Sequence, residues 1–318
     1  MHDLPTASSE SGLLPDGPAS LTEPWIGRSD GRRFFENDEI SALLQRGVFY
    51  ARAGVPIHFQ GAAGRGKTAI AMEIAKRLGR PVSVMTGNEW LDAEDLIGKE
   101  VGQSTRSVVD KYVQRVRRSE ATVRYDWADS ILAEAMARGH TLVYDEFTRS
   151  SAKANGMLLS VLEEGVLIST DRLSDRSEIR AHPEFRIILT SNPRDYAGVN
   201  AAPDALLDRM ITFPLVSYSA QTEAGIVAAR TGIAAPLAAR IVRLVRTLHQ
   251  LSEAPSACSM RAAIMIAQIA ALRLRAARLS DALLAQIAAD VLGGRGITLG
   301  TGQIARHLAA TTRQEEAS

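Results

Sequence analysis

Eight consecutive residues in the first third of the chain have the types and spacing needed to hold a chain of phosphates: Gly61, Ala62, Ala63, Gly64, Arg65, Gly66, Lys67 and Thr68. They match the pattern G-x-x-x-x-G-K-[ST], whose glycines let backbone N–H groups turn towards phosphate oxygens. The lysine ammonium would reach the β- and γ-phosphates, and the Thr68 hydroxyl would bind Mg²⁺. We therefore predict a loop that binds ATP with Mg²⁺; the alternative is a glycine-rich turn with an exposed lysine.

Two carboxylates follow an apolar strand that is predicted over residues 141–144. Asp145 would hold Mg²⁺ directly or through water, and Glu146 would be the general base that activates the attacking water. Because neighbouring strand residues point to opposite sides, the two carboxylates can serve different tasks. The alternative is a strand that simply runs into a solvated acidic loop.

A second apolar strand, predicted over residues 185–190, also ends in polar groups, Ser191 and Asn192. Ligands of open α/β sheets bind at the carboxyl ends of strands, so these ends should converge on the phosphate loop. We expect Asn192 to orient the attacking water from the neighbouring strand. An ordinary Asn-Pro turn is the alternative interpretation.

Short apolar strands alternate with helices through the first two thirds of the chain. Helices are predicted over 38–53 and 68–78, and the polar stretch 88–129 is predicted to be mostly helical. The five predicted strands are 55–59, 81–85, 141–144, 185–190 and 210–213. This alternation predicts an α/β fold, in which a five-stranded parallel sheet is flanked by helices on both faces.

Beyond Pro214 only helical periodicity remains, with breaks near Gly232, Pro236, Pro255 and Ser280. This change predicts a smaller, all-helical second domain. The predicted divisions are a disordered N-terminal tail (1–22), an α/β nucleotide-binding core (23–216), a helical lid (217–294) and a flexible C-terminal tail (295–318).

Composition narrows the class of protein. The 318 residues are 46% hydrophobic and 23% charged, which suits a globular chain with a sizeable core. The net charge of +1 gives no support for a nucleic-acid footprint over the whole surface. The single cysteine, Cys258, excludes a disulfide within the chain and fits a reducing cytoplasm. No run approaches the roughly 18 apolar residues of a membrane span, so we expect no membrane insertion.

The phosphate loop, the Asp-Glu strand end, Asn192 and the helical second domain together resemble the AAA+ ATPases. Residues 91–98 and 152–165 resemble the MoxR branch of that superfamily. A closer resemblance, to the gas vesicle protein N family, rests on Trp127-Ala128-Asp129 and on the run from Gly139 to Ser150, above all Asp-Glu-Phe-Thr-Arg-Ser.

The resemblance implies roles for two arginines. Arg209, in the segment Ala-Leu-Leu-Asp-Arg, resembles an arginine finger that reaches the γ-phosphate of a neighbouring subunit, which implies a homo-oligomeric ring, with a hexamer favoured. Arg261, in Ser-Met-Arg at the start of a long helix, resembles the second sensor of its own subunit. A surface Asp-Arg pair and a solvated helix-terminal arginine are the respective alternatives.

Three departures or additions accompany the resemblance. Arg65 stands where the family more often has a small residue, at a variable position of the motif, so it leaves phosphate binding intact and could alter nucleotide affinity. The segment 167–185 would contain an extra hairpin, and residues 95–124 an insertion that faces the pore or substrate. The arginines of that insertion are interpreted as an ordinary solvated helix face: Arg106, Arg115, Arg117 and Arg118.

The resemblance implies a cytoplasmic ATPase, associated with gas vesicles, that drives remodelling or assembly of other gas vesicle proteins and promotes vesicle formation and growth. Three alternatives stay open. One is a MoxR-type chaperone that activates a metalloenzyme, such as a nitric oxide reductase or rubisco. Another is a scaffold that needs ATP binding but no turnover, which intact Glu146, Asn192 and Arg209 disfavour. The last is translocation on DNA.

Overall fold

A five-stranded parallel sheet forms the centre of the computed structural model, which describes residues 34–109, 119–168, 178–192, 202–251, 258–276, 279–293 and 299–316. The strand order is β2-β5-β8-β1-β9. The strands are β1 (Ile57–Gln60), β2 (Val82–Thr86), β5 (Thr141–Asp145), β8 (Arg186–Ser191) and β9 (Ile211–Pro214). The predicted fold class is therefore confirmed, with each predicted strand within two residues of its observed bounds.

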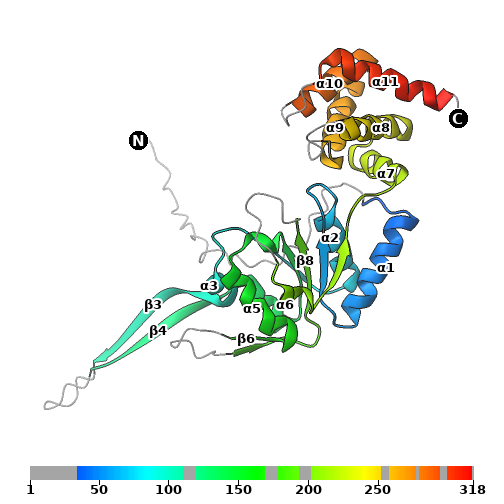
Figure 1. The fold of residues 1–318 in the computed structure, drawn as a ribbon. Coiled ribbons are helices and arrows are strands. Elements are labelled where there is room, and N and C mark those ends of the chain that lie inside the picture. Colours follow the sequence, from blue (N-terminus) through cyan, green and yellow to red (C-terminus); the bar gives the residue numbers. More distant parts are fainter. Residues whose placement is uncertain are drawn as a thin grey trace, which may run out of the picture.

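Helices cover both faces of this sheet because its strands are apolar on both sides (Figure 1). On β5, Val143 packs towards one face, with α1 (Asp38–Arg52) and α2 (Lys67–Leu78). Its neighbours Leu142 and Tyr144 pack towards the other face, with α4 (Ile131–Arg138) and α5 (Ala152–Glu163). Short helical turns complete the core at α3 (Ala93–Ile97), η1 (Phe147–Arg149) and α6 (Asp204–Leu207).

Residues 98–109 and 119–129 form the two strands of a long antiparallel hairpin, so the prediction of a mostly helical stretch over 88–129 was wrong. Strand β3 (Gly98–Val109) pairs with β4 (Ser119–Asp129), and the hairpin projects from the core beside α3 (Figure 1). Among the described residues the two strands pair only with each other, and their sequence has no long apolar run of the kind that marks the strands of the central sheet. Arg106 therefore lies on a strand, while Arg115, Arg117 and Arg118 lie outside the described residues.

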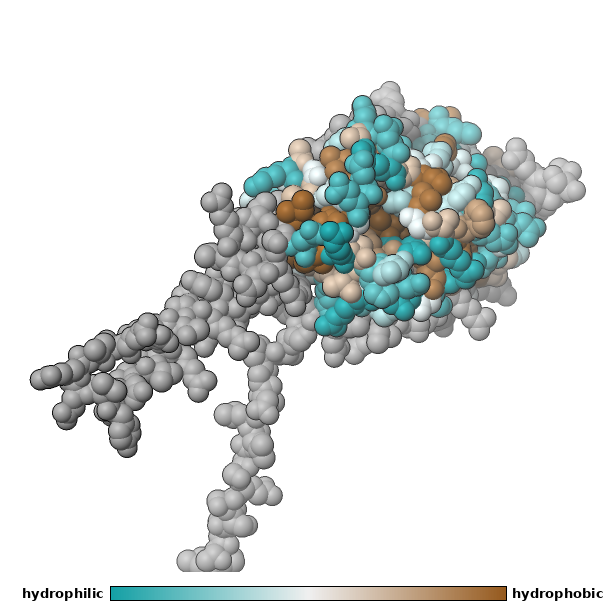
Figure 2. Space-filling model, turned by 90° about the horizontal axis from the view of Figure 1, so that it is seen from below, coloured by the Kyte–Doolittle hydropathy of each residue, from teal (hydrophilic) through white to brown (hydrophobic). Residues whose placement is uncertain are grey.

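A second, shorter hairpin joins β6 (Val166–Ile168) to β7 (Glu178–Arg180), which confirms the hairpin predicted within residues 167–185. The predicted N-terminal tail, residues 1–22, lies outside the described residues. Among the described residues, none of the helices combines the length and apolar character that crossing a membrane requires. Seen from below, the described surface is mostly hydrophilic, with smaller apolar groups between (Figure 2).

The described part of the chain beyond Pro214 is helical, as predicted, and packs around its own hydrophobic cluster. Pro236 lies in the first turn of a helix, where its missing N–H is tolerated. The helices are α7 (Ala220–Thr231), α8 (Ala235–Leu251), α9 (Met260–Ala276), α10 (Asp281–Gly293) and α11 (Thr301–Glu316). The division at residues 216 and 217 between core and lid stays a prediction.

The flexible C-terminal tail predicted for residues 295–318 was wrong for most of its length, because α11 packs on the lid. Ile304 and Leu308, one helical turn apart, are fully buried against this cluster. Two apolar residues on one helix face are a weak periodic signal. The prediction for residues 295–318 therefore rested on their polar composition, which favoured a flexible C-terminus.

Leu308→Ala should lower the free energy of unfolding of the lid by about 2–5 kcal/mol, because it removes a fully buried side chain and leaves a cavity. Chemical denaturation followed by circular dichroism measures this loss. Arg306→Ala, at an exposed position of the same helix, is the matched control and should change stability by no more than about 0.5 kcal/mol. Equal stability of the two variants would show that α11 is not packed.

Candidate active site

The phosphate loop follows β1 directly and leads into α2, and its glycines are required by the backbone. Gly64 and Gly66 have φ angles of 80° and 79°, in the region that favours glycine, and Gly66 is the N-cap of α2. A Cβ on Gly61 would lie 2.5 Å from the carbonyl oxygen of Leu215. The loop is therefore held open at the N-terminus of a helix, a geometry that suits an anion.

Lys67 lies buried under this loop. Its ammonium donates hydrogen bonds to the carbonyl oxygens of Gly61 (2.8 Å) and Ala62 (3.0 Å) and to Oδ1 of Asn192 (2.8 Å). Burial lowers the pKa of Lys67, although the nearby charges of Asp145 and Glu146 act to raise it. A buried ammonium beside an anion-binding loop is suited to a phosphate oxygen, a stronger acceptor than a carbonyl.

Thr68 and Asp145 are brought together, as predicted, at the ends of α2 and β5. The Thr68 hydroxyl donates to Oδ1 of Asp145 at 2.8 Å, and the Thr190 hydroxyl of β8 donates to the same oxygen. Mg²⁺ prefers oxygen ligands, usually one or two protein groups together with phosphates and water. This pair of a hydroxyl and a carboxylate therefore fits the predicted magnesium site.

Glu146 has a left-handed backbone, with φ of 51°, which no other non-glycine residue of the described segments adopts. Its N–H donates to the Thr190 hydroxyl at 3.0 Å, which holds this conformation. Gly87 makes room for it, because a Cβ there would lie 2.3 Å from the Glu146 carbonyl oxygen. Such strain persists where the surroundings impose it, and it is frequent at active sites.

The carboxylate of Glu146 forms an ion pair with Arg149, at 2.5 Å between Oε2 and Nε, that lacks the geometry of a hydrogen bond. Both side chains are about a third or more exposed, so water reaches this carboxylate. The structure therefore places one carboxylate, Asp145, against Thr68, and the next, Glu146, against Arg149.

Arg261 also lies at the loop, as the first turn of α9 packs beside it. A Cβ on Gly64 would lie 3.4 Å from the Cβ of Arg261, and the charge of Arg261 acts to lower the pKa of Lys67. Lys67, Thr68, Asp145, Glu146, Asn192 and Arg261 thus gather at one end of the sheet.

Arg209, in contrast, lies at the other end of the sheet. It precedes β9, which pairs in parallel with β1 so that Pro214 lies opposite Gln60. Counted along the strand direction, Arg209 therefore lies six residues before the level of Gly61, a distance of about 20 Å at the usual rise per residue. Its guanidinium binds Glu163 (2.7 and 3.0 Å) and the Ala205 carbonyl oxygen (2.6 Å). Within one chain it cannot contact the phosphate loop.

A mostly apolar cavity of about 140 Å³ lies between the loop, α1, α2 and the helical domain. Its walls include Gly64 and Gly66 of the loop together with the apolar side chains Phe35, Ile70, Ile226 and Ile264. A flat apolar ring attached to phosphates in the loop would meet this cavity, because small-molecule sites are typically apolar with few polar groups.

Comparison with known proteins now identifies the family. Residues 56–210 match the AAA domain of the dynein-related subfamily. The gas vesicle ATPase GvpN of Ancylobacter aquaticus is 40% identical over 309 residues, which cover 97% of this chain and 84% of that protein. The chain belongs to the GvpN family. It is accordingly an AAA+ ATPase, and the resemblance found in the sequence is confirmed.

More distant relatives agree with the MoxR resemblance and with the fold. Protein NorQ of Paracoccus denitrificans is 24% identical to the GvpN-family chain over 206 residues, 64% of this chain and 69% of NorQ. A mutant of RuvB from Thermotoga maritima shares the fold with a TM-score of 0.50 at 16% identity, covering 81% of this chain and 70% of that one.

Three site residues were missed by sequence reasoning. Thr190 binds both Asp145 and the Glu146 backbone, Arg149 pairs with Glu146, and His58 links two strands. His58 is fully buried on β1, with Nε2 2.8 Å from the Ser191 hydroxyl and Nδ1 3.0 Å from that of Thr212. For Thr190 and His58 the sequence contained one signal, a polar side chain inside an apolar strand.

Burial lowers the pKa of His58 to about 4, from an ordinary value of 6.5. As the pH falls, the imidazole of His58 is therefore protonated in the unfolded chain at a higher pH than in the folded protein. The stability contributed by neutral His58 is complete above pH 6.5 and is lost between pH 6.5 and 4, by about 1.4 kcal/mol per pH unit.

We expect the free energy of unfolding of His58→Gln to fall less steeply than that of the wild type across this pH window, because the variant lacks the titrating imidazole. Urea denaturation at half-unit pH steps measures both slopes. His307→Gln, on α11, controls for the loss of a histidine elsewhere in the chain. Identical slopes in wild type and His58→Gln would show that His58 is not held neutral by the fold.

Proposed function

We propose that this chain hydrolyses ATP to drive remodelling or assembly of gas vesicle proteins, and so promotes the formation and growth of gas vesicles. The observation that carries the proposal is the 40% identity to a gas vesicle ATPase over 97% of the chain, together with the contacts of Lys67 with Asn192 and of Thr68 with Asp145 at the loop. The proposed location is the cytoplasm, in association with vesicles.

In the proposed mechanism each residue has one task. Lys67 neutralises charge on the β- and γ-phosphates, and Thr68 with Asp145 would hold Mg²⁺, which supplies further neutralisation of the phosphates. Glu146 accepts a proton from the attacking water, and Asn192 orients that water. The placement of Asn192 against Lys67, at 2.8 Å, supports this task, because it puts the amide beside the γ-phosphate position.

Arg209 and Arg261 would complete the charge stabilisation from different subunits. Arg261 lies beside the loop of its own chain, whereas Arg209 lies at the far end of the sheet. Only a neighbouring copy can bring Arg209 to a phosphate, so the proposal includes a homo-oligomeric ring, with a hexamer favoured. One arginine of this kind typically accelerates phosphoryl transfer by about 10³–10⁵-fold.

The alternative functions receive less support. A chaperone that activates a metalloenzyme is disfavoured because the identity to the gas vesicle ATPase exceeds that to NorQ, in both value and coverage. A scaffold that binds ATP without turnover would not need the strained Glu146 backbone. The net charge of +1 gives no support for work on DNA.

Glu146→Gln should bind ATP as tightly as the wild type and lose turnover, because the amide cannot accept the proton. In a vesicle-forming host whose own copy of the gene is deleted, it should fail to restore gas vesicles, as should Lys67→Ala. Electron microscopy of the cells and release of phosphate by purified protein measure both effects. Arg306→Ala serves as control and should restore vesicles; normal vesicles with Glu146→Gln would refute a hydrolysis-driven role.

Mixing Lys67→Ala with Arg209→Ala should restore hydrolysis that neither variant has alone. If the two variants assemble at random into rings, about a quarter of the subunit interfaces combine an intact phosphate loop from one subunit with an intact Arg209 from its neighbour. Phosphate release from an equimolar, reassembled mixture measures this. A mixture of Lys67→Ala with Glu146→Gln is the matched control and stays inactive, because those residues serve the same site. Full activity of Arg209→Ala alone would show that Arg209 is not a finger.

A further inference from the structure

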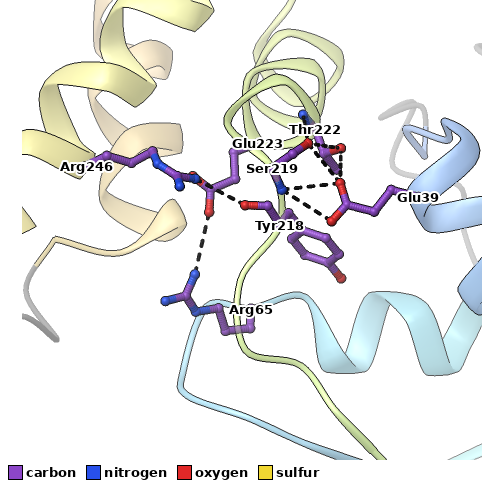
Figure 3. Close-up of polar contacts among 7 residues, drawn as sticks. All are labelled: Glu39, Arg65, Tyr218, Ser219, Thr222, Glu223 and Arg246. Atoms are coloured by element: carbon purple, nitrogen blue, oxygen red, sulfur yellow. Dashed lines mark hydrogen bonds and ion pairs between the residues drawn. The ribbon is translucent and has the colours of Figure 1, made fainter.

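The first helix of the lid, α7, is joined to the core at two places (Figure 3). At the first, Glu39 of α1 accepts hydrogen bonds from the N–H (3.2 Å) and hydroxyl (2.9 Å) of Ser219, and from the Thr222 hydroxyl. Asn37 donates to the same Thr222 hydroxyl at 2.6 Å. This junction fixes the start of α7 to α1 and involves no residue of the phosphate loop.

The second junction connects α7 to the phosphate loop itself. The guanidinium of Arg65 points up from the loop towards the lid, with Nη1 3.5 Å from Oε1 of Glu223 (Figure 3). The other oxygen of Glu223 accepts from Nη1 of Arg246 on α8 at 3.1 Å. Arg246 also donates to the Tyr218 carbonyl oxygen at 3.1 Å. One carboxylate therefore joins the loop to two lid helices.

Burial makes the Glu223 carboxylate sensitive to its partners. Its side chain is only 9% exposed, against 23% for Arg65 and 44% for Arg246. A carboxylate removed from water must keep a positive partner. Its contact with Arg65 is therefore less screened than an ordinary surface ion pair.

The side chain of Arg65 is available for this contact because phosphate binding does not use it. In a loop of this type the backbone N–H groups and Lys67 hold the phosphates. The backbone of Arg65 lies between two left-handed glycines and donates to the Ala62 carbonyl oxygen at 3.4 Å. When that backbone turns to a phosphate, the guanidinium must move with it.

We propose that Arg65 is a positioning residue that transmits phosphate binding to the lid through Glu223, and thereby sets the position of Arg261 at the nucleotide. The proposal rests on the proposed function, since Arg261 acts on the ATP held in the loop. The start of α9 already packs on Gly64, so a shift of the lid against the loop displaces Arg261 directly. Arg65 and Gly64 thus connect one loop to α7 and α9 at once.

Arg65 is the position of the junction that is best suited to a test, because replacing it leaves no buried charge without a partner. Arg65→Ala leaves Glu223 paired with Arg246 inside the lid, so no buried charge loses its only partner. Removal of Glu223 would instead leave two arginines facing each other. Arg65→Lys keeps a positive charge at the junction. Arg240→Ala, which breaks the lid ion pair between Arg240 and Asp281 (2.6 Å), is the matched control for loss of an ion pair away from the loop.

The test uses the full chain with and without a saturating, non-hydrolysable ATP analogue, and follows hydrogen exchange of the backbone of α7. In wild type, Arg65→Lys and Arg240→Ala the analogue should slow this exchange. In Arg65→Ala it should leave the exchange unchanged, while the Kd of the analogue and the KM for ATP stay within about two-fold. Its kcat should fall about five-fold, because displacement of Arg261 weakens a contact to the transition state and leaves ground-state binding unchanged.

The proposal would be overturned if the analogue slowed the exchange of α7 in Arg65→Ala as much as in the wild type and kcat equalled that of the wild type. A loss of analogue binding by more than ten-fold would also overturn it, since Arg65 would then be a ligand of the nucleotide and not a connection to the lid. If the wild type fails to hydrolyse ATP, the proposed function fails, but the exchange experiment still decides whether Arg65 connects the loop to the lid.

Discussion

The buried ammonium of Lys67 needs partners from several strands, and the register of the sheet supplies them. Gly61 and Ala62 follow β1, Asn192 follows β8, and the charges come from Asp145 and Glu146 at the end of β5. In this sheet Val143 lies opposite Ile188, and Ile188 opposite Ile57. A slip of one residue in any strand would turn its side chains to the other face and remove a partner. The site therefore depends on the same register that buries the core.

Core packing and chemistry are separated along each strand, which explains how both are accommodated. The interior positions of β5 and β8 are apolar on both faces, and the functional groups begin where the strands end. Thr190 of β8 and His58 of β1 are polar exceptions among these apolar strand residues. Thr190 holds Asp145 and the strained Glu146 backbone, and His58 connects β8 with β9 through two hydroxyl groups. The buried polar groups thus tie the ends of strands that carry the chemistry.

The sequence predicted the sheet and the phosphate site because both leave local signals. Short apolar runs ending in Asp145 and Asn192 indicate strands and active groups together. The hairpin of β3 and β4 left no such signal, since its residues are mostly polar and contain no long apolar run. The helix α11 was missed because only Ile304 and Leu308 anchor its described part deeply. Contacts such as Arg65 with Glu223 join residues 158 positions apart, and no local pattern encodes them.

In the proposed ring each site is completed by Arg209 of a neighbouring chain, and the contacts of Arg209 within one chain are weak enough to allow this. Its partner in the monomer, Glu163, has a side chain that is 56% exposed. An ion pair this exposed typically contributes no more than about 1 kcal/mol, so exchanging it for another anion costs little. A phosphate chain in a water-poor interface offers a much stronger charge-assisted contact. The pair with Glu163 therefore keeps the guanidinium ordered at the subunit surface without opposing its proposed transfer to a neighbouring site.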